Sequence, residues 1–101
     1  MNVIINDKEY ELSHKFKQLV NIEKETGQSI TRLAMRVFDG DAPIDAVLAV
    51  IFNAIDDDSL TREEVEGYIL QEGVGELIPV YTQYLQIAFV GSKRKDSSKK
   101  K

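Results

Sequence analysis

The sequence predicts a mainly helical α+β fold, in which an N-terminal β-hairpin precedes about five short helices in a compact bundle. Apolar residues recur at helical spacing through most of the chain, β-prone residues flank a turn only in residues 3–12, and short polar or glycine-containing loops separate the segments. Such short loops favour antiparallel neighbouring helices. The 101-residue length suits one domain, which we expect to span residues 1–90.

The hairpin is predicted from three adjoining segments. Residues 3–5 and 9–12 are β-prone, and the residues between them, 6–8, are turn formers. Polar and apolar side chains alternate in residues 9–12, so one face should be buried. An isolated hairpin is marginal in water, so this one must pack against helices.

The first two helices are predicted over about residues 14–26 and 29–38. Ser13 is a plausible N-cap of the first helix, Gly27 ends it, and Ser29 can cap the second. The side chains expected to face inward are Phe16, Leu19, Val20, Ile22, Ile30, Leu33, Ala34, Val37 and Phe38.

The third helix is the most apolar segment and should be central to the core. Pro43 suits its first turn, and residues 56–58 end it. One stripe is expected to be buried, with Val50 and Phe52 off that stripe. The stripe consists of Ile44, Val47, Leu48, Ile51 and Ile55.

Residues 61–64 form a capping-box pattern that starts the fourth helix, and Gly73 and Gly75 end it. The last helix should span about residues 76–90, with Pro79 in its first turn. The apolar residues of the fourth helix are Val65, Tyr68, Ile69 and Leu70. The side chains of the last helix expected to face inward are Leu77, Tyr81, Tyr84, Leu85, Ala88 and Phe89.

The net charge of −4 conceals an uneven distribution. Residues 93–101 carry six basic residues and one acidic residue, whereas residues 1–92 carry seven basic and 16 acidic residues. The acidic part repels nucleic acid, which is therefore not expected as a partner, and attracts a basic protein. Residues 91–101 have no apolar side chain to bury and should form a disordered basic tail.

The residue inventory argues against an enzyme. The absence of cysteine excludes a thiolate zinc site and a cysteine nucleophile, and one histidine excludes a multi-histidine metal site. His14 has no identifiable catalytic partner and should face solvent at a helix start. The carboxylates from residue 56 onward fail the EF-hand spacing, and no phosphate-binding glycine motif occurs. We expect no catalytic, cofactor-binding or metal site.

The chain also lacks a membrane span and a signal peptide, so the cytoplasm is the default compartment. Tyrosine is enriched at protein interfaces because one end of its ring is apolar and the other polar. Core burial is the alternative role for the apolar candidates. The partner-binding candidates are Val50, Phe52, Tyr68, Tyr81 and Tyr84.

Residues 16–33 read F-x-x-L-x-x-I-E-x-x-T-G-x-S-x-x-x-L, and T-R-E-E-V at residues 61–65, Gly73 and Y-L-Q-I-A at residues 84–88 follow in order. Over residues 8–90 the chain resembles the small tail assembly chaperones of tailed phages, especially the group that includes a protein of gene transfer agents. The motif itself is structural, since Gly27 permits a left-handed turn between two helices.

The resemblance implies a non-enzymatic chaperone that binds the tape measure protein. It also implies the tail tube protein as a further partner. An amphipathic helix of the partner would lie in a groove between helices. It also implies a host-cytoplasmic protein that is absent from the mature virion. The oligomeric state stays open, including a homo-oligomer.

Two alternatives remain. One is a small structural tail or head–tail component that stays in the virion. The other is a nucleic-acid-binding regulator that uses residues 14–38 as a helix-turn-helix. The second helix of that pair has only Arg32 and Arg36 as basic residues, which argues against groove docking.

Overall fold

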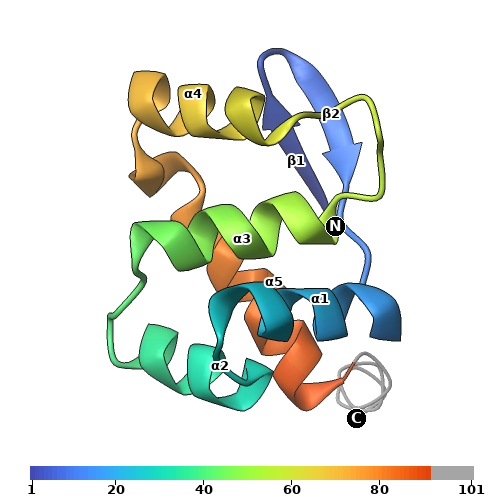
Figure 1. Ribbon diagram of the computed structural model, residues 1–101. Coiled ribbons are helices and arrows are strands. Elements are labelled where there is room, and N and C mark those ends of the chain that lie inside the picture. The colour runs from blue at the N-terminus through green and yellow to red at the C-terminus, as the bar shows by residue number, and fades with distance from the viewer. Residues whose placement is uncertain (92–101) are drawn as a thin grey trace, which may run out of the picture.

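The computed structural model describes residues 1–91 and confirms the predicted fold class, a two-stranded antiparallel hairpin followed by five α-helices (Figure 1). The predicted basic tail, beyond Gly91, lies outside the described residues. The elements are β1 (Asn2–Ile5), β2 (Lys8–Glu11), α1 (Phe16–Thr26), α2 (Ile30–Phe38), α3 (Ile44–Ala54), α4 (Arg62–Glu72), the 3-10 helix η1 (Val74–Glu76) and α5 (Ile78–Val90).

The hairpin turns over two residues, Asn6 and Asp7, which both have positive φ angles of 54° and 67°. Asn and Asp tolerate this left-handed backbone, and two such residues match the right-handed twist of the flanking strands. Ile5 pairs with Lys8 across the turn. The predicted alternation is confirmed, because Tyr10 is buried between two exposed glutamates.

The start of α1 differs from the prediction. Ser13 is not its N-cap, because the backbone N–H of Ser13 donates to the Ala54 carbonyl at 2.8 Å, and Leu12 forms a β-bridge with Ile55. These bonds keep the chain extended, so α1 begins at Phe16 after Lys15. Phe16, predicted to face inward, is 81% exposed.

The other helix ends follow the sequence closely. Gly27 closes α1 with a φ angle of 68°. The Ser29 hydroxyl accepts a hydrogen bond from the Arg32 amide at 3.0 Å. At the start of α4, Thr61 and Glu64 form both bonds of a capping box, at 3.2 and 2.9 Å. The Ser29 cap and the Thr61–Glu64 capping box satisfy backbone N–H groups that a helix N-terminus leaves unpaired.

Helix α3 lies at the centre of the fold, between α1 and α4 (Figure 1). The predicted stripe is only partly correct: Val47 and Ile51 are fully buried, but Ile44 is 55% exposed and Leu48 is only partly buried. The buried face is rotated toward Val50. Its other members are alanines, which let neighbouring elements approach closely: Ala46, Ala49 and Ala54.

Helix α5 packs against α2 and α3, with Tyr81, Tyr84 and Leu85 fully buried. Its last turn lies at the surface, because Phe89 is 44% exposed. Phe38, at the end of α2, is 52% exposed and meets the Phe89 ring edge-on at 6.3 Å between centroids. Both phenylalanines were predicted to face inward, and the structure places them at the rim.

His14 joins the segment before α1 to α5, and does not face solvent as predicted. Its ring stacks on Tyr84 with centroids 3.9 Å apart. Its Nε2 donates to the Tyr84 carbonyl at 3.0 Å, and the Tyr84 hydroxyl donates to the Ser13 carbonyl. Burial lowers the pKa of His14, although the bond to the Tyr84 carbonyl opposes that shift. Burial raises the pKa of Tyr84 to about 12.

We predict that Ile51→Ala lowers the free energy of unfolding by about 2–5 kcal/mol, as for other buried aliphatic side chains cut to alanine. Leu48→Ala is the matched control on the same helix and should cost less, because part of that side chain already contacts water. Urea unfolding of both variants measures the difference. An equal cost at the two positions would contradict the burial pattern of α3.

We also predict that stability falls as the pH drops below 6.5, the ordinary histidine value, toward the lower pKa of His14 in the folded protein. In that range the unfolded chain takes up a proton that the folded chain resists, so the stability present above pH 6.5 is lost. Urea midpoints from pH 8 down to pH 5 measure the slope. In the His14→Gln variant, stability should depend less on pH over this range. An unchanged slope would mean that other groups cause the pH dependence.

Candidate partner-binding groove

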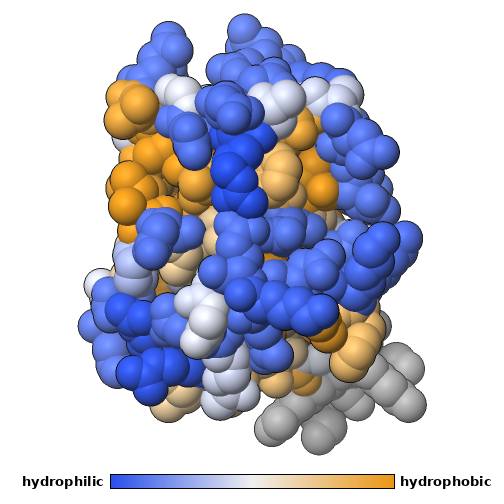
Figure 2. Space-filling view, in the orientation of Figure 1, coloured by the Kyte–Doolittle hydropathy of each residue, from blue (hydrophilic) through white to orange (hydrophobic). Residues whose placement is uncertain are grey.

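An open apolar groove lies between α3 and α4. It has a volume of about 320 Å³. Figure 2 shows an orange, hydrophobic area on the left of the view at the level of these two helices. We call it the α3/α4 groove, and the residues that line it are Ile44, Asp45, Leu48, Glu66, Ile69 and Leu70.

The floor and the walls of the groove differ in exposure. Ile69 is 6% exposed and belongs to the core, and Leu48 is partly buried beside it. On the walls, Ile44 is 55% and Leu70 is 85% exposed. A leucine this exposed gains almost nothing from folding, since hydrophobic stabilisation scales with the apolar area removed from water. Contiguous exposed apolar surface of this kind marks interaction sites.

The helical repeat explains why these side chains face outward. Ile69 and Leu70 are neighbours in α4 and lie about 100° apart around its axis, so one faces the core and the other does not. Val65 and Ile69, four residues apart, form the buried face. On α3, the core occupies the side of Val47 and Val50, which leaves Ile44 toward the groove.

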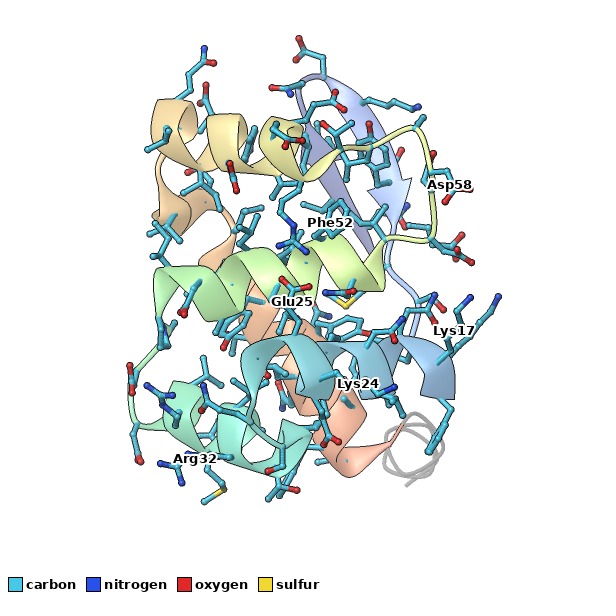
Figure 3. The ribbon with its side chains drawn as sticks, viewed as in Figure 1. Lys17, Lys24, Glu25, Arg32, Phe52 and Asp58 are labelled. Carbon is cyan, nitrogen blue, oxygen red and sulfur yellow. The ribbon has the colours of Figure 1, made fainter. Side chains whose placement is uncertain are left out.

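A polar contact fixes α4 relative to α1 and α3. The Arg62 guanidinium donates to both Glu25 carboxylate oxygens, at 2.6 and 2.8 Å, and stacks over the Phe52 ring at 4.8 Å. Asn53 on α3 donates to the same carboxylate at 2.9 Å. Figure 3 shows Glu25 between α1 and α3, and Phe52 on the side of α3 that faces α4. Two parallel hydrogen bonds give such an ion pair a defined geometry.

The Glu25–Arg62 pair also shifts the pKa values of both side chains. The hydrogen bond from Arg62 lowers the pKa of Glu25, and the same bond raises the pKa of Arg62.

The groove lies in a strongly acidic stretch of the sequence. Arg62 is the one basic residue in residues 37–91, which contain eleven acidic residues and therefore carry a net charge of −10. Residues 1–36 carry six basic and five acidic residues. The α3/α4 groove therefore lies in the strongly acidic part of the chain.

Three of the five predicted partner-binding residues are in the core. Val50, Tyr81 and Tyr84 are 0% exposed, so they cannot touch a partner docked on this surface. Phe52 is half-buried beneath Arg62, and Tyr68 is half-buried on α4. None of the five lines the α3/α4 groove. The tyrosine rings are amphipathic, but here the fold uses their apolar bodies for the core.

The sequence analysis placed Ile44 and Leu48 on the buried stripe of the third helix, and it did not predict that Leu70 would face solvent. One signal was available: Ile69 and Leu70 are adjacent, so a helix cannot bury both against one neighbour. Within residues 1–91, no group of three or more His, Cys, Asp or Glu side chains could hold a metal ion. No helix in that part of the chain is long and apolar enough to cross a membrane.

Comparison with known families identifies the chain. The model of a family described as "Phage tail tube protein, GTA-gp10" matches residues 1–91. The chain belongs to this family. No curated protein and no solved structure matches it significantly. The matched residues include every helix and strand of the described fold and both walls of the α3/α4 groove.

Membership of the GTA-gp10 tail tube family confirms the predicted link to phage tails, and it corrects the predicted location. The resemblance implied a host-cytoplasmic protein that is absent from the mature virion. A tail tube protein is part of the tail of the assembled particle, so that expectation is wrong. The alternative drawn from the sequence, a structural tail component, fits the family better than an assembly chaperone does.

We predict that Leu70→Ala changes the free energy of unfolding by less than about 0.5 kcal/mol, as for surface substitutions in general. Ile69→Ala, at the adjacent residue, should cost about 2–5 kcal/mol because that side chain belongs to the core. Urea unfolding of the two variants provides the comparison. A large loss for Leu70→Ala would mean that the groove stabilises the isolated fold and is not kept open for a partner.

Proposed function

We propose that the protein is a non-enzymatic structural component of the phage tail, held there by another tail protein that binds in the α3/α4 groove. The observation that supports this most is the groove itself, with Leu70 85% exposed on a chain of the GTA-gp10 tail tube family. Apolar surface left open in the isolated chain is what a subunit of a larger assembly presents before its neighbour binds.

The tape measure protein and the tail tube protein are the partners we propose, as the sequence resemblance implied. The tape measure protein is a long, largely helical chain with much apolar surface, and a helix is the element that fits between two helices. The tail tube protein would be a neighbour in the same assembly. In either case the chain contributes a binding surface to the tail.

An assembly chaperone is the second candidate function. The same groove supports it, because a chaperone must also offer accessible apolar surface to its client. The two functions share a partner and differ in what happens after the tail is complete. Analysis of finished particles therefore distinguishes them directly.

We predict that purified particles contain this chain in a fixed ratio to the other tail proteins. Quantitative mass spectrometry of gradient-purified particles measures that ratio, and gold-labelled antibody in electron micrographs should mark the tail. A phage protein with no place in the particle, followed in the same samples, controls for contamination. If the chain is abundant in the lysate but missing from the particles, the structural proposal is wrong and the chaperone function takes its place.

A further inference from the structure

We propose that the α3/α4 groove accepts an amphipathic helix whose apolar stripe is flanked by lysine or arginine side chains. This inference deepens the proposed function, and it rests on that function only for the statement that the helix belongs to a tail protein. It commits to the chemistry of the occupant. Three features of the described residues carry it: the shape of the groove, its charge, and the poor fit of other occupants.

The dimensions of the groove suit a helix better than a small molecule. Helix α4 has eleven residues and is therefore about 16 Å long, which is about three turns of a helix lying alongside it. The volume of about 320 Å³ is near the lower end of the roughly 300–1,000 Å³ of small-molecule sites. Four of the six lining residues are aliphatic, so few polar groups converge there to orient a small ligand.

The polar groups at the groove carry one sign of charge. Asp45 and Glu66 are the two charged residues that line it, and both are exposed. Glu63, Glu66 and Leu70 follow at the i, i+3 and i+7 spacing of one helix face, so the acidic edge continues along α4. Arg62 offsets this edge only in part: its guanidinium is bound to Glu25, and it interacts with Glu63 and Glu66 through space without a direct ion pair. A basic flank on the incoming helix would complement it.

Two occupants from this chain fit poorly. Residues 92–101 are basic, but they contain no apolar side chain that could fill an aliphatic groove. A second copy would bring another set of residues 1–91, which carry a net charge of −9, toward an acidic rim. Like charges brought together at an interface disfavour that pairing. A basic helix from a different protein satisfies both the apolar and the charge requirement.

A second apolar hollow of about 310 Å³ provides a control surface. It lies between α1, α2 and α5 and is lined in part by Phe16, Leu19 and Phe89. Most of its lining comes from residues 1–36, which carry a net charge of +1. Glu23 is its one charged lining residue, so it offers apolar side chains in less acidic surroundings than the α3/α4 groove. A purely hydrophobic ligand would use either surface, whereas a basic helix should prefer the α3/α4 groove.

The test uses two synthetic peptides and the full chain. Both peptides are fluorescein-labelled helices of about four turns, with leucines at i, i+3, i+4 and i+7 spacing. One carries lysine and arginine beside the stripe, and the other carries glutamate at the same positions. Fluorescence anisotropy should show the basic peptide binding at least about tenfold more tightly, and added salt should weaken that binding.

Matched variants locate the binding site. Leu70→Ala and Glu66→Lys should each weaken binding of the basic peptide by about tenfold, which corresponds to about 1.4 kcal/mol. Phe16→Ala removes an exposed apolar side chain outside the groove and should have no effect. Glu72→Lys repeats the charge reversal on α4, about 200° around the helix from Leu70, and should change the affinity much less.

Several results would overturn the proposal. Equal affinity for the two peptides would remove the charge preference, and a loss of binding in Phe16→Ala but not in Leu70→Ala would move the site to the other hollow. Sedimentation that shows a dimer of the full chain, dissociated by Leu70→Ala, would make a second copy the occupant. Because the assay needs no particles, its failure is distinguishable from absence of the chain in purified tails.

Discussion

The burial of α3 determines the arrangement of the other helices. Ala49 and Ile51 are both buried although they lie on nearly opposite sides of the helix, so α3 must be covered on more than one side. Helix α1 covers one side, α4 and α5 cover others, and the end of the hairpin pairs with Ile55 at its C-terminus. That cover leaves Ile44 and Asp45 exposed at the start of the helix, whereas no residue of its second half is fully exposed. The exposed Ile44 side chain forms one wall of the α3/α4 groove.

Polar contacts at the edges give this hydrophobic arrangement its geometry. The Arg62–Glu25 pair connects α4 to α1 across α3, and the stack of His14 on Tyr84 connects the segment before α1 to α5. Each joins elements far apart in the sequence, and each involves side chains in defined directional bonds. Hydrophobic burial alone is non-directional and would allow the helices to slide. The first of these contacts fixes the start of α4 relative to α1.

Features that depend on neighbouring residues were predictable from the sequence. The turn predicted at residues 6–8, the Ser29 cap and the Thr61–Glu64 capping box are local. The structure confirms both caps and narrows the turn to Asn6 and Asp7. The orientation of α3 was not predictable from the sequence. A helix that is apolar on every side carries no signal for which of its faces will be buried. The groove combines side chains from two helices that are well separated in the sequence, so no local pattern describes it. The sequence left Tyr81 and Tyr84 open between core and interface for the same reason, since their role depends on what packs around them.

The acidic charge near the groove also bears on how an exposed apolar surface stays free until its partner arrives. Leu70 and Ile44 would favour self-association if nothing opposed it. The net charge of −10 on residues 37–91 opposes the approach of a second copy at long range, and it attracts a basic helix over the same distance. The apolar floor then supplies affinity at short range, where charge pairs at the rim contribute mainly orientation and association rate. The same carboxylates therefore disfavour a second copy of the chain at the groove and favour a basic helix.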